Sequence, residues 1–227
     1  MKKNNKKNEI ILTCEDVSYR YADAEKDEYV FKGLNYSFEA GKTYAIKGKS
    51  GSGKTTLLSL ISGLETRYEG NIVFEDKNLR NMNLDKYRNS SIGIVFQSYN
   101  LLVHLNALEN IILSMDINHT KGIDKKEKAL GLIKSVGLNE TQAKRRVLKL
   151  SGGEQQRVAI ARSLSYNPKM IIADEPTGNL DKETEDEIMD IFKRLAHEEN
   201  KCVIIVTQSK NVADNCDIVY ELKPNRK

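Results

Sequence analysis

The chain has 227 residues, a formal net charge of +4 at pH 7, 39% hydrophobic residues and 30% charged residues. This balance is typical of a soluble globular protein with one large domain or two small ones. The charge is small for the length and does not indicate a nucleic-acid partner. No apolar run reaches the roughly 20 residues of a membrane span, and no secretory signal follows the basic start. We therefore expect any membrane role to come through a partner chain.

The cysteines and histidines do not indicate a metal centre. Three cysteines are an odd number without metal-binding spacing, which predicts free, mostly buried thiols in a reducing cytosol. The three histidines are scattered along the chain, so we do not expect a metal ion held by protein side chains alone. The residues concerned are Cys14, Cys202, Cys216, His104, His119 and His197.

The first part of the chain predicts antiparallel strands that lie beside a parallel core. Residues 9–21 and 30–39 alternate apolar and polar side chains, as half-buried strands do. Residues 22–27 form a polar turn between them. Short strands are expected at residues 43–47 and 70–74, with the first turns of a helix at residues 56–61.

The later part of the chain alternates helices and buried strands. Apolar runs at residues 92–96, 170–173, 203–206 and 218–222 predict strands. Helices are expected across residues 106–147, with starts at Asn106 and Asp124, and over residues 152–166 and 182–200. This order favours an α/β fold with a mainly parallel sheet. We expect one domain over residues 9–227, a helical subdomain at about residues 98–165 within it, and a basic tail, residues 1–8, that is disordered or touches an anionic membrane surface.

Residues 48–55, with the sequence GKSGSGKT, fit the phosphate-loop pattern G-x-x-x-x-G-K-[ST]. A predicted strand precedes the loop and a predicted helix follows it. This context favours a phosphate loop over an ordinary Gly/Ser-rich surface turn. Glycines let backbone N–H groups converge on an anion, and the helix N-terminus adds partial positive charge. We expect Lys54 to reach the β- and γ-phosphates and Thr55 to offer its hydroxyl to Mg²⁺. The predicted nucleotide-binding residues here are Gly48, Ser50, Gly51, Ser52, Gly53, Lys54, Thr55 and Thr56.

Two carboxylates end the apolar strand predicted at residues 170–173. We expect Asp174 on the metal side and Glu175 as the general base that accepts a proton from an attacking water. Alone, the pair could be a strand end before a turn at Pro176. The phosphate loop upstream favours the catalytic interpretation.

Residues 150–157, LSGGEQQR, combine a helix cap with two glycines. Ser151 and Glu154 form a capping box. The cap does not explain Gly152 and Gly153, each of which costs about 1 kcal/mol relative to Ala inside a helix. We therefore expect a ligand, most naturally a phosphate, to approach the exposed N–H groups closely.

Together these stretches resemble the motifs of ATP-binding-cassette (ABC) ATPases over about residues 9–222. Residues 48–55 and 170–175 match the two Walker motifs of that family, and residues 150–157 its signature. Gln97 resembles the Q-loop, Asp181 lies in a segment similar to the D-loop, and Tyr21 occupies the position of an aromatic that stacks on adenine. Residues 153–162 and 173–181 are most similar to the branch that serves lipoprotein-release, macrolide and antimicrobial-peptide permeases and includes a cell-division ATPase.

The resemblance implies a P-loop fold of ABC type, with ATP and Mg²⁺ bound and Thr55, Gln97 and Asp174 on the metal. It implies that two ABC subunits, identical or different, pair head to tail, so that residues 151–154 of one complete the site at Lys54 of the other. Closure would power a separate permease at the cytoplasmic face of the cell membrane, and the permease would dock near Gln97 and the helical subdomain. The alternative is a mechanical or regulatory subunit that moves no substrate.

One position departs from the family pattern. The family usually has a histidine after the strand at residues 203–206, where this chain has Gln208. We include Gln208 with Glu175 and Gln97 among the catalytic candidates. Glutamine can donate a hydrogen bond to a γ-phosphate oxygen but cannot carry positive charge. The hypothesis is slower hydrolysis with ATP binding retained, and the alternative is a tolerated replacement.

Overall fold

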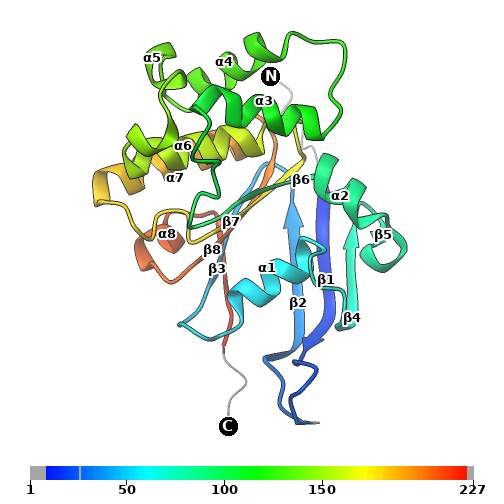
Figure 1. Ribbon diagram of the computed structural model, residues 1–227. Helices are drawn as coiled ribbons and strands as arrows, with labels where there is room; N and C mark the ends of the chain where they lie inside the picture. The colour runs from blue at the N-terminus through cyan, green and yellow to red at the C-terminus, as the bar shows by residue number, and fades with distance from the viewer. Residues whose placement is uncertain (1–8, 26, 224–227) are drawn as a thin grey trace, which may run out of the picture.

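The computed structural model describes residues 9–25 and 27–223, so the predicted basic tail, residues 1–8, lies outside the described residues. Two sheets organise this part of the chain (Figure 1). The first has four antiparallel strands in the order β2-β1-β4-β5. Their bounds are Ile10–Tyr19 for β1, Phe31–Glu39 for β2, Glu69–Phe74 for β4 and Lys77–Asn78 for β5.

The second sheet has five strands, all parallel, in the order β6-β7-β8-β3-β9. Because the strands are parallel, their carboxyl ends meet at one edge of the sheet. The chain thus has the predicted α/β architecture, a parallel core beside a separate antiparallel part. The bounds are Thr43–Lys47 for β3, Ile92–Val95 for β6, Met170–Asp174 for β7, Cys202–Thr207 for β8 and Ile218–Glu221 for β9.

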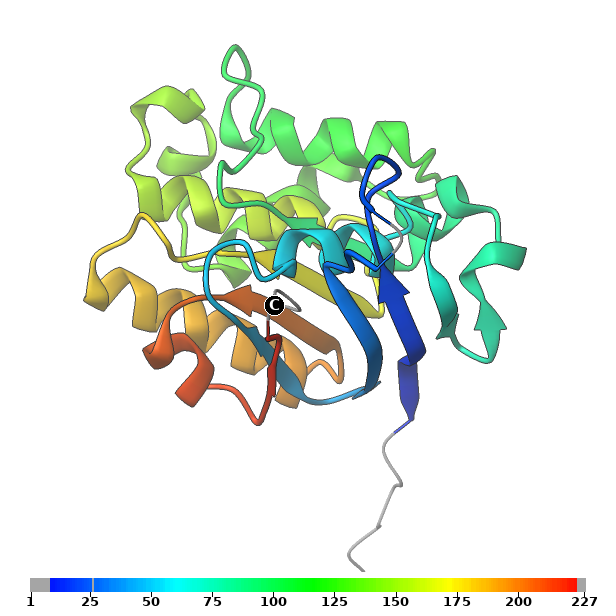
Figure 2. The ribbon, with the colours of Figure 1, turned by 90° about the horizontal axis from the view of Figure 1, so that it is seen from below.

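Helices cover both faces of the parallel sheet. Seen from below, α1 lies on one side of the sheet and α6 and α7 lie on the other (Figure 2). Helices α3, α4 and α6 pack against one another, and α5 against α4. The α-helices are α1 Lys54–Ile61, α2 Leu84–Ser90, α3 Ala107–Ile117, α4 Lys125–Ser135, α5 Glu140–Ala143, α6 Gly152–Ser163, α7 Lys182–His197 and α8 Lys210–Asp214. Short 3-10 turns lie at Leu79–Asn81 and Val147–Lys149.

The predicted helix starts are confirmed by their caps. Asn106 and Glu109 form a capping box at α3, and the Asp124 side chain accepts hydrogen bonds from two N–H groups at the start of α4. A further capping box at Asn139 begins α5. The sequence pattern did not predict α2 and α8, because each is at most two turns long and carries little amphipathic repeat.

Two apolar clusters share the parallel sheet as a common wall. Ile171 and Ala173 of β7 face the cluster that contains α6 and α7, whereas Met170 and Ile172 face α1 and the antiparallel sheet. Side chains alternate along a strand, so a strand covered on both faces must be apolar throughout. The three cysteines are free, as expected. In the described part of the chain, no helix combines the length and the apolar character that crossing a membrane requires.

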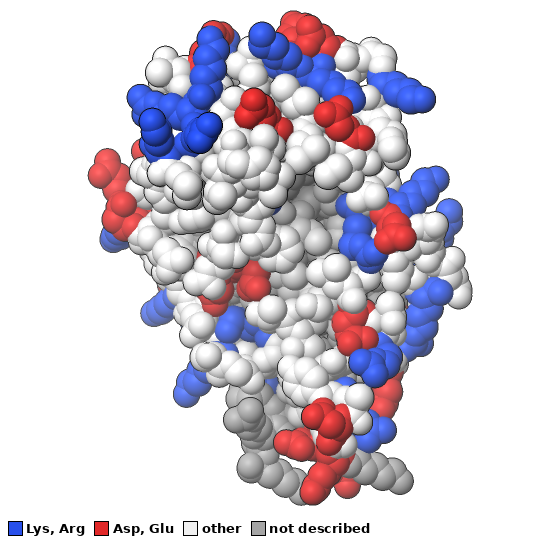
Figure 3. Space-filling model, in the orientation of Figure 1, with Lys and Arg blue, Asp and Glu red and all other residues white. Residues whose placement is uncertain are grey.

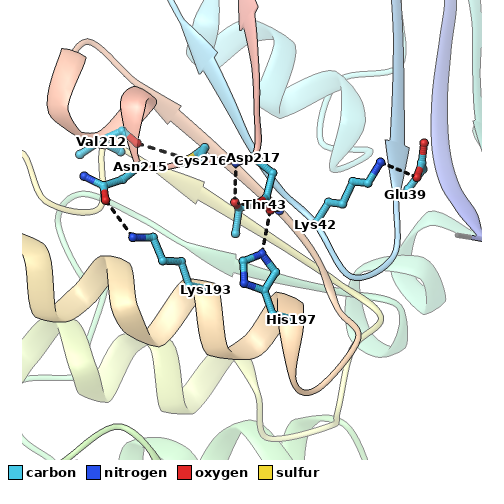
Figure 4. A network of polar contacts seen from close by, with 9 residues as sticks. All are labelled: Glu39, Lys42, Thr43, Lys193, His197, Val212, Asn215, Cys216 and Asp217. Atoms are coloured by element: carbon cyan, nitrogen blue, oxygen red, sulfur yellow. Dashed lines mark hydrogen bonds and ion pairs between the residues drawn. The ribbon is translucent and has the colours of Figure 1, made fainter. Parts of the chain in front are cut away.

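A polar network closes the sheet edge opposite the strand carboxyl ends (Figure 4). Asp217 Oδ2 accepts hydrogen bonds of 2.8 Å from both Thr43 N and Thr43 Oγ1, and lies 2.8 Å from His197 Nε2. Asp217 N donates to Thr43 Oγ1 at 3.0 Å. This contact ties the start of β3 to the end of α7 and to the turn before β9.

Candidate functional site

A cavity of about 1380 Å³ opens beside the carboxyl ends of β3 and β7. This is the edge where open parallel sheets bind ligands, and the volume is sufficient for a nucleotide. The cavity brings together most of the predicted site. Its lining includes Tyr21, Ser50, Gly51, Gly53, Lys54, Thr55, Thr56, Gln97, Asp174, Glu175 and Gln208.

The phosphate loop holds its lysine in a fixed position. The Lys54 side chain is only 7% exposed, and Nζ donates to the carbonyls of Gly48 at 2.9 Å and Lys49 at 3.1 Å. Its Nζ lies 3.9 Å from Glu175 Oε1. Gly53, just before the helix, has φ 92°, and a Cβ there would lie 2.5 Å from Val30 Cγ1. The close packing of the β2 start therefore requires this glycine.

Asp174 lies at the end of β7 and faces the start of α1. Thr55 Oγ1 donates to Asp174 Oδ2 at 3.2 Å. Burial raises the pKa of Asp174 above its usual value, the Thr55 hydrogen bond opposes that shift, and the neighbouring Glu175 adds to it. A cation at this position would reverse the shift.

Glu175 has an unusual backbone conformation for a non-glycine residue, with φ 44°. A hydrogen bond from its N–H to Val206 O, 2.9 Å long, holds the turn. Its Oε2 accepts from Thr207 Oγ1 and from Gln208 N, both at 3.2 Å. The carboxylate is therefore fixed at one oxygen, and the strained backbone is the kind that collects at functional sites.

Three buried side-chain oxygens of this region have no hydrogen-bond partner among the described residues. They are Ser52 Oγ, Asp174 Oδ1 and Glu175 Oε1. Buried polar atoms are costly without partners. The carboxylate oxygens beside Thr55 Oγ1 are hard ligands that suit Mg²⁺, and Lys54 suits phosphate. The residues present thus fit a magnesium nucleoside triphosphate.

Tyr21 stands at the rim of the cavity with 53% of its surface exposed. Tyr19 packs edge-on against the Tyr21 ring at 5.4 Å between centroids. The Tyr21 hydroxyl lies 3.3 Å from Thr56 Oγ1 on α1. An exposed aromatic face fixed in this way can stack on a base.

The signature segment, residues 150–157, does not join this cavity, whose lining within the described chain includes none of residues 151–154. Ser151 caps α6, with its Oγ accepting from Glu154 N at 3.2 Å and its N donating to Glu154 Oε2 at 2.7 Å. A hydrogen bond from the Gln142 side chain, together with the cap, lowers the pKa of Glu154. The N-terminus of α6 therefore belongs to a separate surface.

One signature glycine has a reason within the chain that sequence reasoning did not anticipate. A Cβ on Gly153 would lie 2.4 Å from Thr184 Cγ2 of α7, whereas a Cβ on Gly152 would come no closer than 3.1 Å to the Tyr99 hydroxyl. Asp181 is the N-cap of α7, and its carboxylate accepts from Thr184 N and Thr184 Oγ1, both at 2.9 Å. Packing and capping of the helices therefore explain Gly153 of the signature and Asp181 of the segment similar to the D-loop in part.

Sequence reasoning treated residues 22–27 only as a turn, and missed that acidic residues from this region line the cavity. These residues are Asp23, Glu25, Asp27 and Glu28. The sequence position could have indicated this, because the turn directly follows Tyr21, the residue predicted to stack on adenine.

The amino-acid sequence is similar to those of known proteins. The ABC transporter family matches residues 31–178. The chain is 46% identical over 212 residues to an uncharacterized ABC transporter ATP-binding protein, YclH, of Bacillus subtilis, with 93% of each chain covered. It is 37% identical over 221 residues to the lipoprotein-releasing system ATP-binding protein LolD of Francisella tularensis, covering 95% of this chain and 94% of that one.

Solved structures agree with the sequence relatives. The dimeric structure of MJ0796, a bacterial ABC transporter cassette, superposes with a TM-score of 0.84 at 36% identity, covering 95% of this chain and 97% of that one. A second dimeric structure of MJ0796 is bound to ADP and Pi, a post-hydrolysis state. The protein described here belongs to the ABC transporter ATP-binding family. The predicted fold class is confirmed, and the chain is an ATP-binding subunit of that family.

Proposed function

We propose that this chain hydrolyses ATP at a site shared between two subunits, and that closure of the pair powers a separate membrane permease. One observation carries the proposal. The cavity gathers Lys54, Asp174 and Glu175, while the glycine-containing N-terminus of α6 lies outside it. A helix N-terminus with exposed N–H groups suits phosphate. A second subunit, identical or different and turned head to tail, would bring Ser151 and Gly152 to the γ-phosphate.

Glu175 would act as the general base. Its Oε2 is held by Thr207 and by the N–H of Gln208, which leaves Oε1 to accept a proton from the attacking water. Lys54 would exchange its two carbonyl partners for oxygens of the β- and γ-phosphates, since charge-assisted hydrogen bonds are the stronger ones. Tyr21 would stack on adenine.

Thr55, Asp174 and Gln97 would hold Mg²⁺. Thr55 and Asp174 are already hydrogen-bonded to each other, and Gln97 lines the same cavity. When bound, Mg²⁺ supplies charge that polarises the phosphate oxygens and neutralises the developing charge. Because the pKa of Asp174 is raised and a metal ligand must be deprotonated, Mg²⁺ binding is expected to strengthen as pH rises through that pKa.

Gln208 would set a slower rate than histidine at this position. Its side chain lines the cavity and its N–H holds Glu175, so it is placed to donate to the γ-phosphate without adding positive charge. Gln208→His is expected to raise kcat several-fold with little change in the Kd for ATP. A kcat no higher than that of the parent would show that glutamine is a tolerated replacement.

The subunit would act peripherally at the cytoplasmic face of the cell membrane, bound to its permease, with no nucleic-acid partner. The name of the lipoprotein-releasing relative supports a transport system. Sedimentation velocity of Glu175→Gln, with and without saturating Mg-ATP, tests the shared site. A dimer is expected only with Mg-ATP, because nucleotide contributes to the interface. A monomer under both conditions would contradict the proposal.

A further inference from the structure

Two patches of opposite charge lie at opposite ends of the molecule (Figure 3). The acidic loop, residues 22–29 between β1 and β2, carries four exposed carboxylates, those of Asp23, Glu25, Asp27 and Glu28. The basic turn, residues 144–149 between α5 and the signature, carries four exposed cations, those of Lys144, Arg145, Arg146 and Lys149. In Figure 3 carboxylates gather at the lower end, while lysine and arginine side chains gather at the upper left.

The acidic loop keeps a surplus of negative charge within the described part of the chain. None of its four carboxylates makes an ion pair of 4.0 Å or less with a described residue, and the remaining charged residue of the loop, Lys26, lies outside the described part. All four line the cavity proposed to hold ATP. Since a triphosphate is itself anionic, negative charge at this rim disfavours its binding. The rim therefore suits a cationic partner from outside the chain.

The basic turn has a surplus of positive charge, which complements the acidic loop. Arg145 interacts electrostatically with Glu154, which lowers the pKa of that carboxyl after the larger effect of the Gln142 hydrogen bond. Arg146 and Lys149, by contrast, make no ion pair with a described residue. Leu148 between them is 70% exposed. Arginine is enriched at protein interfaces, so a turn with two exposed arginines suits a contact surface.

We infer that the basic turn of one subunit docks on the acidic loop of a second copy of this chain when ATP is bound. The inference rests on the proposed head-to-tail dimer, in which Ser151 of one subunit faces the phosphate loop of the other. Lys149 is two residues from Ser151, at most about 7 Å along the chain. The acidic loop lines the same cavity as that phosphate loop. The contact between the two subunits thus brings the patches to the same rim.

The pairing links nucleotide binding to dimer closure. Before closure the acidic loop opposes the negative charge of ATP, and after closure the partner's basic turn neutralises the loop. Because both patches are exposed at the rim, their attraction acts mainly on the association rate and is screened by salt. The dimer formed by Glu175→Gln with Mg-ATP is therefore expected to weaken between 0.05 and 0.5 M NaCl, by about tenfold or more.

A charge-swap experiment in the Glu175→Gln background tests the pairing. The first variant reverses the basic turn with Arg146→Glu and Lys149→Glu. The second reverses the acidic loop with Glu25→Lys and Glu28→Lys. A control matched to the first variant, Lys121→Glu with Lys126→Glu, makes the same charge change elsewhere. Lys121 lies exposed in the loop before α4, and Lys126 lies exposed on α4. Sedimentation with saturating Mg-ATP gives the dimer Kd of each variant and of the equimolar mixture of the first two.

Each reversed variant alone is expected to raise the dimer Kd by about tenfold or more, because like charges then face each other at both rims. The mixture is expected to recover a Kd within about threefold of the parent, since each loop then meets an oppositely charged turn. The control should stay within about twofold. Reversed variants that behave like the control, or a mixture that does not recover, would overturn the inference.

Two further measurements, on Glu175→Gln alone and on lipid vesicles, distinguish failure of the shared site, failure of the pairing and a membrane role of the basic turn. If Glu175→Gln itself stays monomeric in Mg-ATP, the proposed shared site is overturned, and the pairing that rests on it is overturned with it. If that dimer forms and the swap has no effect, only the pairing fails. Loss of binding to phosphatidylglycerol vesicles by the first variant, with its dimer Kd unchanged, would assign the basic turn to a membrane surface and overturn the inference. Neutral versions with Gln at the same positions, checked by thermal melts, replace any reversed variant that does not fold.

Discussion

The two ends of strand β3 differ in how their polar groups are satisfied. At its start, the Thr43 N–H and hydroxyl and the Asp217 carboxylate bond to one another, and His197 closes the group. Beyond its end, the phosphate loop and the neighbouring strand ends hold buried oxygens, including Asp174 Oδ1 and Glu175 Oε1, without a hydrogen-bond partner among the described residues. Both ends belong to the same sheet and share its buried core.

This difference separates stability from function. A closed network stabilises the fold, because every polar group that leaves water finds a partner. An open one destabilises the free chain and keeps its donors and acceptors for a ligand. Substitutions at the strand carboxyl ends should therefore change nucleotide chemistry with little loss of stability. Substitutions at the opposite edge should do the reverse.

Glu175→Gln should give the largest effect. Removing the base is expected to lower kcat by about 10²–10⁴-fold, while the Kd for ATP changes by less than about threefold because the side-chain shape is kept. Steady-state ATPase assays and nucleotide titration measure the two quantities. An ATPase rate close to that of the parent would remove Glu175 from the proposed role.

Lys54→Met should come next. Loss of the ammonium is expected to weaken ATP binding by about 100-fold, because charge-assisted hydrogen bonds to phosphate are lost. The unfolding free energy should change little, because the saved desolvation cost of the 7% exposed charge is offset by the lost contacts of Lys54 with two carbonyls and with Glu175. Isothermal titration and urea unfolding check both halves. A variant that lost unfolding free energy and kept its affinity for ATP would contradict the functional role assigned to the carboxyl ends of the strands.

Gly153→Ala should act on folding first. The added methyl would meet Thr184 Cγ2 at 2.4 Å, which is expected to cost about 1–3 kcal/mol of unfolding free energy through overpacking. Combining it with Thr184→Ser, which removes the opposing methyl, should recover most of the loss. Gly152→Ala is the matched control, because its nearest contact is 3.1 Å. Equal costs at both glycines would show that the Thr184 contact is not the cause.

Asp217→Asn should give the smallest effect, and one that depends on pH. Burial raises the pKa of Asp217, but hydrogen bonds from Thr43 and His197 outweigh it, so the net shift is downward. A lowered pKa contributes stability above the unfolded pKa, near 3.9 for aspartate, and loses it as pH falls through the folded pKa. The variant should lose at most about 1 kcal/mol at pH 7, because solvent screens the partly exposed group. Urea unfolding should show the two proteins converging below about pH 4.

Sequence reasoning reached the parts of this molecule that repeat along the chain or follow a fixed spacing. The apolar runs at β7 and β8 and the loop at residues 48–55 specify their own local structure. It did not reach features that depend on distant segments, such as the contact of Gly153 with Thr184, the positive φ of Glu175 or the acidic rim. The division of the domain at about residues 98–165 stays a prediction.

Ser151→Asp in the Glu175→Gln background tests the central claim, that one subunit holds the nucleotide cavity and the other supplies the signature. Aspartate keeps the N-cap of α6 but sets a carboxylate against the γ-phosphate. Sedimentation in saturating Mg-ATP is the measurement, with nucleotide titration of the same sample. We expect a monomer whose affinity for ATP is close to that of a single Glu175→Gln subunit. A dimer as stable as the parent's, or a monomer that no longer binds ATP, would contradict it.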